Sequence, residues 1–122
     1  MGYESRLYVV DKTNGKISGR NGVRYWADVI ATFNLCKVYG VSDKMREYPE
    51  TDCFIYADDG NTEIVEDRYG DVMKEIPIED AIKIIEEASM HDGYRRYAPC
   101  LALLKSFDKI QWRNLVVLHY GY

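Results

Sequence analysis

Residues 23–35 read VRYWADVIATFNL, and their alternation decides the fold class. Every odd position in this stretch is apolar, whereas most even positions are polar. A period of two is typical of a β-strand that buries one face. A helical stripe through Trp26, Ile30 and Phe33 can also be drawn, but it is shorter. We therefore expect one long strand over residues 23–35, and a strand of this length bends or twists with its sheet.

The segments on either side of this strand predict further β-structure and loops. Residues 3–11 indicate a first strand, with Leu7 and Val9 on one face and Tyr8 and Val10 on the other. Residues 13–22 are glycine-rich and polar, which is typical of a loop. The polar residues 40–51 are expected to form a loop or a short helical turn.

A hairpin is expected at residues 53–66. Two β-rich runs, 53–57 and 62–66, flank Asp58-Asp59-Gly60-Asn61. An Asp-Gly pair favours a type I′ turn, in which both central residues have positive φ. The expected cross-strand pairs are Ile55 with Ile64 and Phe54 with Val65.

Two helices and a last strand complete the expected elements. Residues 78–90 and 94–107 both carry apolar residues at helical spacing, and Pro77 precedes the first helix. Residues 115–120 are apolar on both faces, as in a central or covered strand. The fold class is therefore α+β: a mainly antiparallel, bent β-sheet with two helices in the C-terminal half.

Composition limits the classes of function. The 122 residues are 47% hydrophobic and 30% charged, as expected for a single globular domain over residues 1–122. The net charge of −4 repels polyanions, so neither DNA nor RNA is an expected partner. No apolar run approaches the roughly 18 residues of a membrane-spanning helix, and the N-terminal residues lack the apolar segment of a secretion signal. We expect a cytosolic protein without a membrane partner.

The sequence contains no recognisable catalytic motif or metal-binding motif. The three cysteines have no C-x-x-C spacing, the two histidines are far apart, and glycine patterns that bind phosphates or dinucleotides do not occur. The acidic run from Asp58 to Asp67 does not fit a calcium loop and is interpreted as turn residues and a solvated strand face. We therefore predict no catalytic residue, no metal and no cofactor.

Clusters of arginine and aromatic residues are the strongest candidates for a site. The second helix is expected to begin at Tyr94-Arg95-Arg96-Tyr97, where unpaired backbone amides favour an anion and arginine adds donors for phosphate. Arg24-Tyr25-Trp26 and Arg68-Tyr69 repeat the pairing. Arginine for a phosphate and a ring for a base are the minimum for a nucleotide pocket, although each cluster alone is also typical of surface ion pairing.

Several segments resemble a family of small phage proteins, the first Thoeris anti-defence family. The likeness runs over nearly the whole chain. Its segments are Met-Gly-Tyr-Glu-Ser-Arg-Leu-Tyr-Val-Val at the start, Trp26-Ala27-Asp28-Val29-Ile30-Ala31, Tyr56-Ala57-Asp58-Asp59-Gly60-Asn61-Thr62, Glu66-Asp67-Arg68-Tyr69-Gly70, Tyr94-Arg95-Arg96, and Val117-Leu118-His119-Tyr120-Gly121-Tyr122 at the end.

The resemblance implies a function. Members of that family bind the cyclic ADP-ribose isomer made by a bacterial TIR-domain enzyme and sequester it without cleavage in the host cytoplasm. The family is similar to a V-shaped antiparallel sheet with a helical part, and its members assemble as dimers or higher oligomers with pockets between protomers. Its arginine and aromatic contacts carry over to Arg24, Arg68, Tyr69, Tyr94, Arg95 and Arg96, with Asp92 as a further candidate for a ribose hydroxyl or an adenine amine.

Two alternatives remain open at this point. The chain could be a metal-dependent phosphodiesterase that degrades the signal with the carboxylates of residues 58–67. It could also be a phage inhibitor that binds a host protein directly through its tyrosine-rich acidic surface. A homo-oligomer is expected in any case, because eleven tyrosines and two-faced strands offer more apolar surface than one small core buries.

Overall fold

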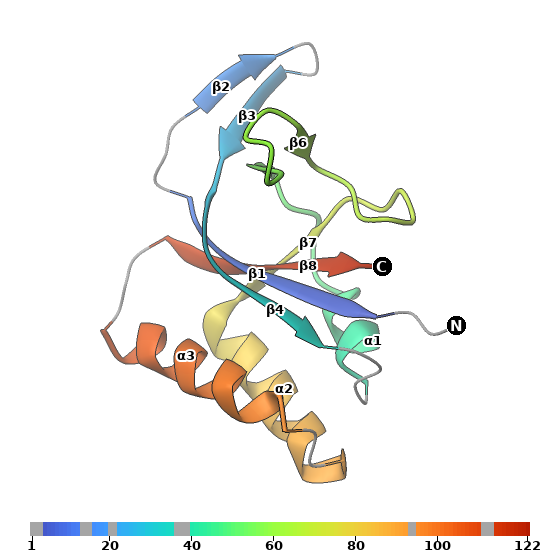
Figure 1. Cartoon of the computed structure of the whole chain (residues 1–122), viewed down its shortest axis with the longest axis vertical. Coiled ribbons are helices and arrows are strands. Elements are labelled where there is room, and N and C mark those ends of the chain that lie inside the picture. Colours follow the sequence, from blue (N-terminus) through green and yellow to red (C-terminus); the bar gives the residue numbers. More distant parts are fainter. Residues whose placement is uncertain (1–3, 13–15, 20–21, 36–39, 93–94, 111–113) are drawn as a thin grey trace.

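The computed structural model describes residues 4–12, 16–19, 22–35, 40–92, 95–110 and 114–122 (Figure 1). Its elements combine helices with two small sheets, which confirms the α+β class. The elements in chain order are β1 (Ser5–Asp11), β2 (Lys16–Gly19), β3 (Gly22–Trp26), β4 (Asp28–Leu35), α1 (Val41–Met45), β5 (Cys53–Tyr56), β6 (Glu63–Ile64), β7 (Lys74–Pro77), α2 (Ile78–Asp92), α3 (Tyr97–Ile110) and β8 (Leu115–Gly121).

The main sheet is antiparallel and has the strand order β4-β1-β8-β7. The expected last strand, β8, lies between β1 and β7 and is buried over most of its length, so the prediction of a central strand is confirmed. The described ends of the chain lie together, because Glu4 and Tyr122 exchange two backbone hydrogen bonds of 2.9 and 3.0 Å. We call this the terminal end of the sheet.

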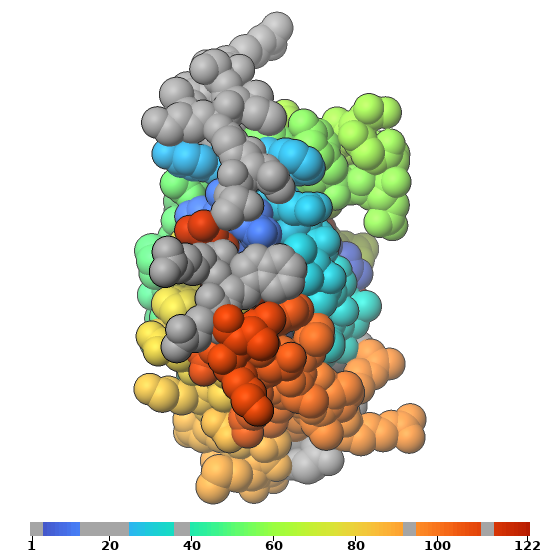
Figure 2. All heavy atoms as spheres, turned by 90° about the vertical axis from the view of Figure 1, so that its left-hand side faces the viewer, coloured from blue at the N-terminus to red at the C-terminus, as the bar shows by residue number. Residues whose placement is uncertain are grey.

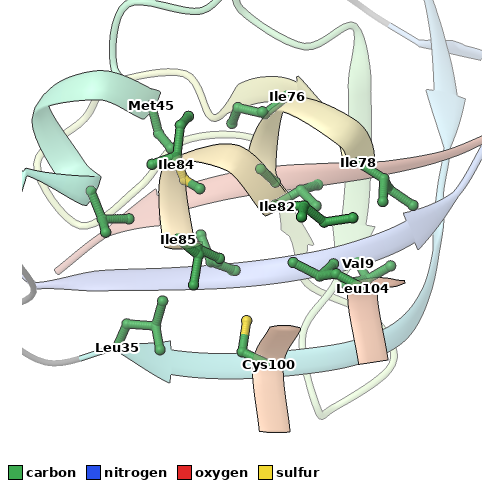
Figure 3. Packing of buried hydrophobic residues seen from close by; sticks show 14 of the residues in the cluster. Val9, Leu35, Met45, Ile76, Ile78, Ile82, Ile84, Ile85, Cys100 and Leu104 are labelled. Atoms are coloured by element: carbon green, nitrogen blue, oxygen red, sulfur yellow. The ribbon is translucent and has the colours of Figure 1, made fainter. Parts of the chain in front are cut away.

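Helices α2 and α3 cover one face of the main sheet and form the larger core with it (Figure 3). Leu7 and Val9 of β1 point into this core, and Ile85 of α2 and Leu104 of α3 meet them there. All four side chains are fully buried. Burial of such side chains is the main stabilising term, at roughly 1.5–3 kcal/mol each.

The stretch that was expected to be one long strand forms two strands in different sheets. It is interrupted at Ala27, where the chain passes from β3 in the second sheet to β4 in the main sheet (Figure 1). Ala27 is buried in a second, smaller core between the sheets. The expected bend is therefore present, but the prediction of one continuous strand is wrong, because the two halves pair with different partners.

The second sheet has the order β2-β3-β5-β6 and includes a parallel pair, β3 with β5. The expected pair of Ile55 and Ile64 is confirmed. The paired residues of β5 and β6 end at Ile55 and Ile64, so the expected pair of Phe54 and Val65 is not part of them; on its other side, Phe54 pairs with Trp26 of β3. The prediction of a loop over residues 13–22 is also wrong in part, because β2 forms a hairpin with β3.

The β5–β6 turn differs from the expected type I′. Gly60 has a positive φ of 73°, whereas Asp59 does not. The amide of Gly60 donates to the carbonyl of Ala57 at 2.9 Å, and the Asp59 carboxylate accepts from the amides of Asn61 and Thr62, each at 2.8 Å. The carboxylate therefore stabilises a four-residue loop that the Asp-Gly pair alone did not predict.

Both long helices were predicted, with shifted ends. Helix α2 begins directly after Pro77 and carries Glu79 and Asp80 in its first turn, where the helix dipole favours negative charge. Helix α3 begins at Tyr97, later than expected, and Pro99 is tolerated in its first turn. None of the helices in the described part of the chain has the length and apolar character needed to cross a membrane.

Candidate functional site

The terminal end of the main sheet carries an arginine that lies over tyrosine rings. Arg6 of β1 lies opposite Tyr120 of β8, on the face that is turned away from α2 and α3. The guanidinium carbon of Arg6 is 4.6 Å from the ring centre of Tyr122 and 5.5 Å from that of Tyr120. These distances are those of cation–π contacts.

Hydrogen bonds hold Arg6 in this position. Its Nε donates to Oδ1 of Asn34 on β4 at 2.7 Å, and its Nη1 donates to the hydroxyl of Tyr8 at 3.3 Å. Burial favours the neutral form of Arg6, but the hydrogen bond to Tyr8 and the neighbouring tyrosine hydroxyls outweigh it, and the pKa of Arg6 is raised. Arg6 thus presents a permanent positive charge on an aromatic surface.

A hollow adjoins this surface between the two sheets. Its volume is about 350 Å³, and Tyr120 forms one wall of it. The segment from Glu63 to Asp67 supplies the rest of its described lining. Figure 2 shows the region of β5 and β6, in green, above the cyan β4, seen from the side opposite this hollow. Carboxylates on such a wall can accept hydrogen bonds from hydroxyl or amino groups.

The predicted pair Arg68-Tyr69 lies beside this hollow, on a loop that several hydrogen bonds hold in place. One carboxylate oxygen of Asp67 accepts from the amides of Tyr69 at 2.8 Å and Asp71 at 3.1 Å, and the other accepts from the amide of Gly121 at 3.3 Å. The amide of Arg68 donates to the carbonyl of Gly121 at 3.1 Å. Both predicted side chains are exposed, and Tyr69 is one of the large hydrophobic residues most open to solvent.

The terminal end carries a row of side chains that runs from β4 through β1 to β8, and the predicted pair Arg95-Arg96 lies at its β4 edge. Both side chains are exposed in the turn before α3, and Nη1 of Arg96 donates to the backbone carbonyl of Asn34 at 3.0 Å. Because Asn34 also binds Arg6, the two guanidinium groups share one neighbour. Strands in a sheet are about 4.8 Å apart, so the row from β4 to β8 spans roughly 10 Å.

Three of the predicted site residues are not placed in this row. Arg24 belongs to β3 and pairs with Ile17, far from the terminal end, and its side chain lies outside the described part. Asp92 is the last residue of α2, and its side chain is likewise outside the described part. Tyr94 lies outside the described residues. Their predicted roles stay predictions.

Sequence reasoning missed the centre of the site, namely Arg6, Tyr120 and Tyr122. The two tyrosines are more than a hundred positions from Arg6, so no local cluster marks them. The available signal was the alternation that places Arg6 with Tyr8, and Tyr120 with Tyr122, on one face of each terminal strand. Only the pairing of β1 with β8 brings these faces together.

A buried polar group lies under the same end of the sheet. His119 is 2% exposed, its Nε2 is 2.9 Å from the hydroxyl of Ser5, and that hydroxyl also contacts the hydroxyl of Ser42. Burial lowers the pKa of His119 to about 4, against the effect of the Asp67 charge, so the ring is neutral at pH 7. The residue stabilises the β1–β8 pairing below Arg6 and Tyr120.

One group of potential metal ligands lies elsewhere in the described residues. Asp52, Cys53 and Glu75 each place a ligand atom within 4.8 Å of the others. The ammonium group of Lys12 lies 3.0 Å from both carboxylates and already supplies a cation. Burial raises the pKa of the Cys53 thiol to about 11, so it is protonated at pH 7. This arrangement is an internal ion-pair network.

Comparison with known protein families, with curated proteins and with solved structures finds nothing that matches this chain.

Proposed function

We propose that this protein is a non-catalytic binding protein that captures a small phosphorylated nucleotide of the cyclic ADP-ribose class. The observation that carries the proposal is the guanidinium of Arg6, held over the rings of Tyr120 and Tyr122, the first of which also lines a hollow. Arginine binds phosphate through charge-assisted hydrogen bonds, and an exposed ring stacks on a base. The guanidinium of Arg6 and the two tyrosine rings are in contact, so one ligand can reach both.

Each part of the row has a chemical counterpart in such a ligand. Arg6 and Arg96 are the donors for the phosphates, and the tyrosines are the surface for the base. Glu66 lines the hollow beside Tyr120 and accepts from a ribose hydroxyl or an amino group, whereas Asp67, which also lines it, holds the loop. Arg68 and Tyr69 lie beside the hollow, on the loop that Asp67 holds through hydrogen bonds. This assignment extends the predicted arginine–aromatic clusters to residues from both ends of the chain.

The proposal includes the biological role that the resemblance to the first Thoeris anti-defence family implies. By sequestering the signal in the host cytoplasm, the protein would block TIR-based bacterial immunity. Within the acidic run from Asp58 to Asp67, two carboxylates already accept backbone amides and stabilise loops. That use favours a binding role over metal-dependent cleavage.

A release experiment tests the proposal. Purified protein is incubated with a cyclic ADP-ribose isomer, separated from free ligand, and heated to unfold it. We expect the intact nucleotide to be recovered in the supernatant. A degraded product would instead identify a phosphodiesterase, and the absence of uptake would favour a protein-directed inhibitor. Arg6→Ala should reduce uptake strongly, whereas Lys83→Ala, an exposed cation on α2, is the matched control with unchanged uptake expected.

We also propose that the protein acts as a homo-oligomer, a dimer or larger. Tyr69 and Tyr56 are among its exposed large hydrophobic side chains, and contact with a second copy would cover such surface. Light scattering at micromolar concentration tests this. A mass of 14.2 kDa, that of one chain, would contradict it.

A further inference from the structure

A second and larger hollow lies at the end of the main sheet opposite the terminal end. Its volume is about 520 Å³, within the range of small-molecule sites. The start of α2, the last turns of α3 and the first residues of β8 surround it, on the left-hand side of Figure 1. The apolar part of its lining consists of Pro49, Pro77, Ile78, Phe107, Leu115 and Val116.

The polar groups around this hollow are acidic. Glu75, Glu79 and Asp108 line it, and the described lining residues include no lysine, arginine or histidine. Glu75 is paired with Lys12. Glu79 and Asp108 are exposed, and neither forms an ion pair or side-chain hydrogen bond with the residues that the structure describes. Two carboxylates without an ion-pair partner among the described residues therefore border an apolar floor.

The two helix ends at this hollow act differently on the two carboxylates, because Glu79 lies at the positive end of the α2 dipole and Asp108 at the negative end of the α3 dipole. Asp108 lies in the last turn of α3, where unpaired carbonyl groups carry the negative end of the helix dipole. An acidic residue there is unfavourable for the helix, whereas a cation bound beside it would be stabilised by both the carboxylate and the dipole.

An aromatic wall completes the hollow. The hydroxyl of Tyr48 donates to Oδ2 of Asp80 at 2.9 Å, which fixes the position of the ring. The neighbouring carbonyl of Pro49 accepts from the amide of Glu75 at 2.9 Å, so this segment is tied to β7. Aromatic rings beside carboxylates attract ammonium groups through the ring face, in addition to the direct ionic attraction.

We propose that this hollow binds a small organic cation, namely a protonated amine on a hydrocarbon chain. The chain would lie on the apolar floor, and the ammonium group would point to Glu79 and Asp108. The inference rests on the match between the ammonium group and the two carboxylates, and between the hydrocarbon chain and the apolar lining. It is independent of the nucleotide site proposed at the terminal end. A ligand with a carboxylate or a phosphate would be repelled.

Titration with three six-carbon probes tests this proposal. Hexylammonium, hexanol and hexanoate share the hydrocarbon chain and differ in charge. We follow the amide and methyl NMR signals of Leu115 and Val116 in the full chain. We expect hexylammonium to shift these signals with a Kd in the millimolar range, hexanol to bind more weakly and hexanoate not to bind. Higher salt concentrations should weaken the binding of hexylammonium.

Substitutions locate the charge that is responsible. Glu79→Gln and Asp108→Asn should each weaken hexylammonium binding by about 2- to 5-fold, as for other exposed ionic contacts. Asp108→Lys should abolish it. Asp58→Asn removes the same charge from the β5–β6 turn in the second sheet and is the matched control, with unchanged affinity expected.

Three outcomes would overturn the proposal. The first is the absence of shifts at Leu115 and Val116 with hexylammonium while the spectrum shows a folded chain. The second is hexanol binding as tightly as hexylammonium, which would identify an apolar hollow without charge selectivity. The third is an equal loss of affinity in Asp58→Asn and Asp108→Asn, which would assign the effect to overall charge.

Discussion

The two faces of the main sheet belong to the same strands but carry different side chains. Towards α2 and α3, β1 presents Leu7 and Val9 to a fully buried apolar core. On the other face, β1 presents Arg6 to the rings of Tyr120 and Tyr122. Apolar burial contributes stability in proportion to area and needs no particular geometry. A guanidinium over rings contributes little to stability but can recognise a ligand.

This difference predicts which face tolerates change. Substitutions in the helix-covered face should lower the free energy of unfolding, and substitutions at the terminal end should lower affinity while the fold persists. The following experiments either separate the two faces in this way or show that they are coupled.

The largest effect is expected from the core of the helix-covered face. Leu104→Ala removes a fully buried side chain of α3 and should lower the free energy of unfolding by about 2–5 kcal/mol. Ile64→Ala, at a half-buried position beside the smaller core, should cost clearly less. Urea unfolding of both variants measures the difference. Equal losses would mean that the two cores contribute alike.

A comparable loss in the free energy of unfolding is expected when the pH is lowered, because of His119. Burial, its main cause, lowers the pKa of His119 to about 4 in the folded chain, from 6.5 for an unperturbed histidine. The unfolded chain therefore binds more protons as the pH falls from 7 to 4, and the folded state loses about 3 kcal/mol of stability over that interval. This contribution is fully present above pH 6.5.

The variant His119→Asn isolates that contribution. It should be less stable at pH 7, because the buried bond to Ser5 changes, but its stability should fall less steeply towards pH 4. Urea unfolding at a series of pH values gives the pH dependence of the free energy of unfolding for the variant and for the wild type. Identical slopes for variant and wild type would show that His119 does not titrate as its burial implies.

The main effect on binding is expected at Arg6. Arg6→Ala removes a charge-assisted contact and should weaken binding of a cyclic ADP-ribose isomer by about 10- to 150-fold, or roughly 1.5–3 kcal/mol. Calorimetry measures the affinity, with Lys83→Ala as the control. Wild-type affinity in Arg6→Ala would place the nucleotide site elsewhere.

The effect at Tyr69 is expected to be similar or smaller. Tyr69→Ala removes a ring that is 55% exposed beside the hollow, and a stacked base would lose about 1–3 kcal/mol of binding free energy. Stability should change by no more than about 0.5 kcal/mol, because the loop is held by Asp67 rather than by the ring. Calorimetry and urea unfolding of the same variant test both statements, and unchanged affinity would exclude Tyr69 from the site.

The smallest effects are expected from Arg95 and Arg96, and they should be unequal. Arg96 donates to the carbonyl of Asn34, the residue that also binds Arg6, and Arg96→Ala should weaken binding by about 2- to 5-fold. Arg95→Ala should change affinity less. Calorimetry of both variants and of the double variant checks this order, and a stronger effect at Arg95 would reverse it.

Much of the fold was predictable because its signals are local. Helices α2 and α3, the central strand β8 and the pairing of Ile55 with Ile64 follow from apolar periodicity over short windows. The split at Ala27 was not predictable, because both halves of residues 22–35 alternate in the same way and only their pairing partners differ. The loop at Asp59 also depended on side-chain hydrogen bonds that a dipeptide pattern does not contain.

The candidate site was predictable only in its type. The sequence by itself determined that arginines stand next to aromatic residues, and it placed Arg95-Arg96 at the expected start of the second helix. The tertiary structure decided that Arg6 meets Tyr120 and Tyr122, and that Asn34 links Arg6 to Arg96. The physical reason is that periodicity specifies which face of a strand a residue occupies, whereas strand pairing brings together residues that are distant in sequence.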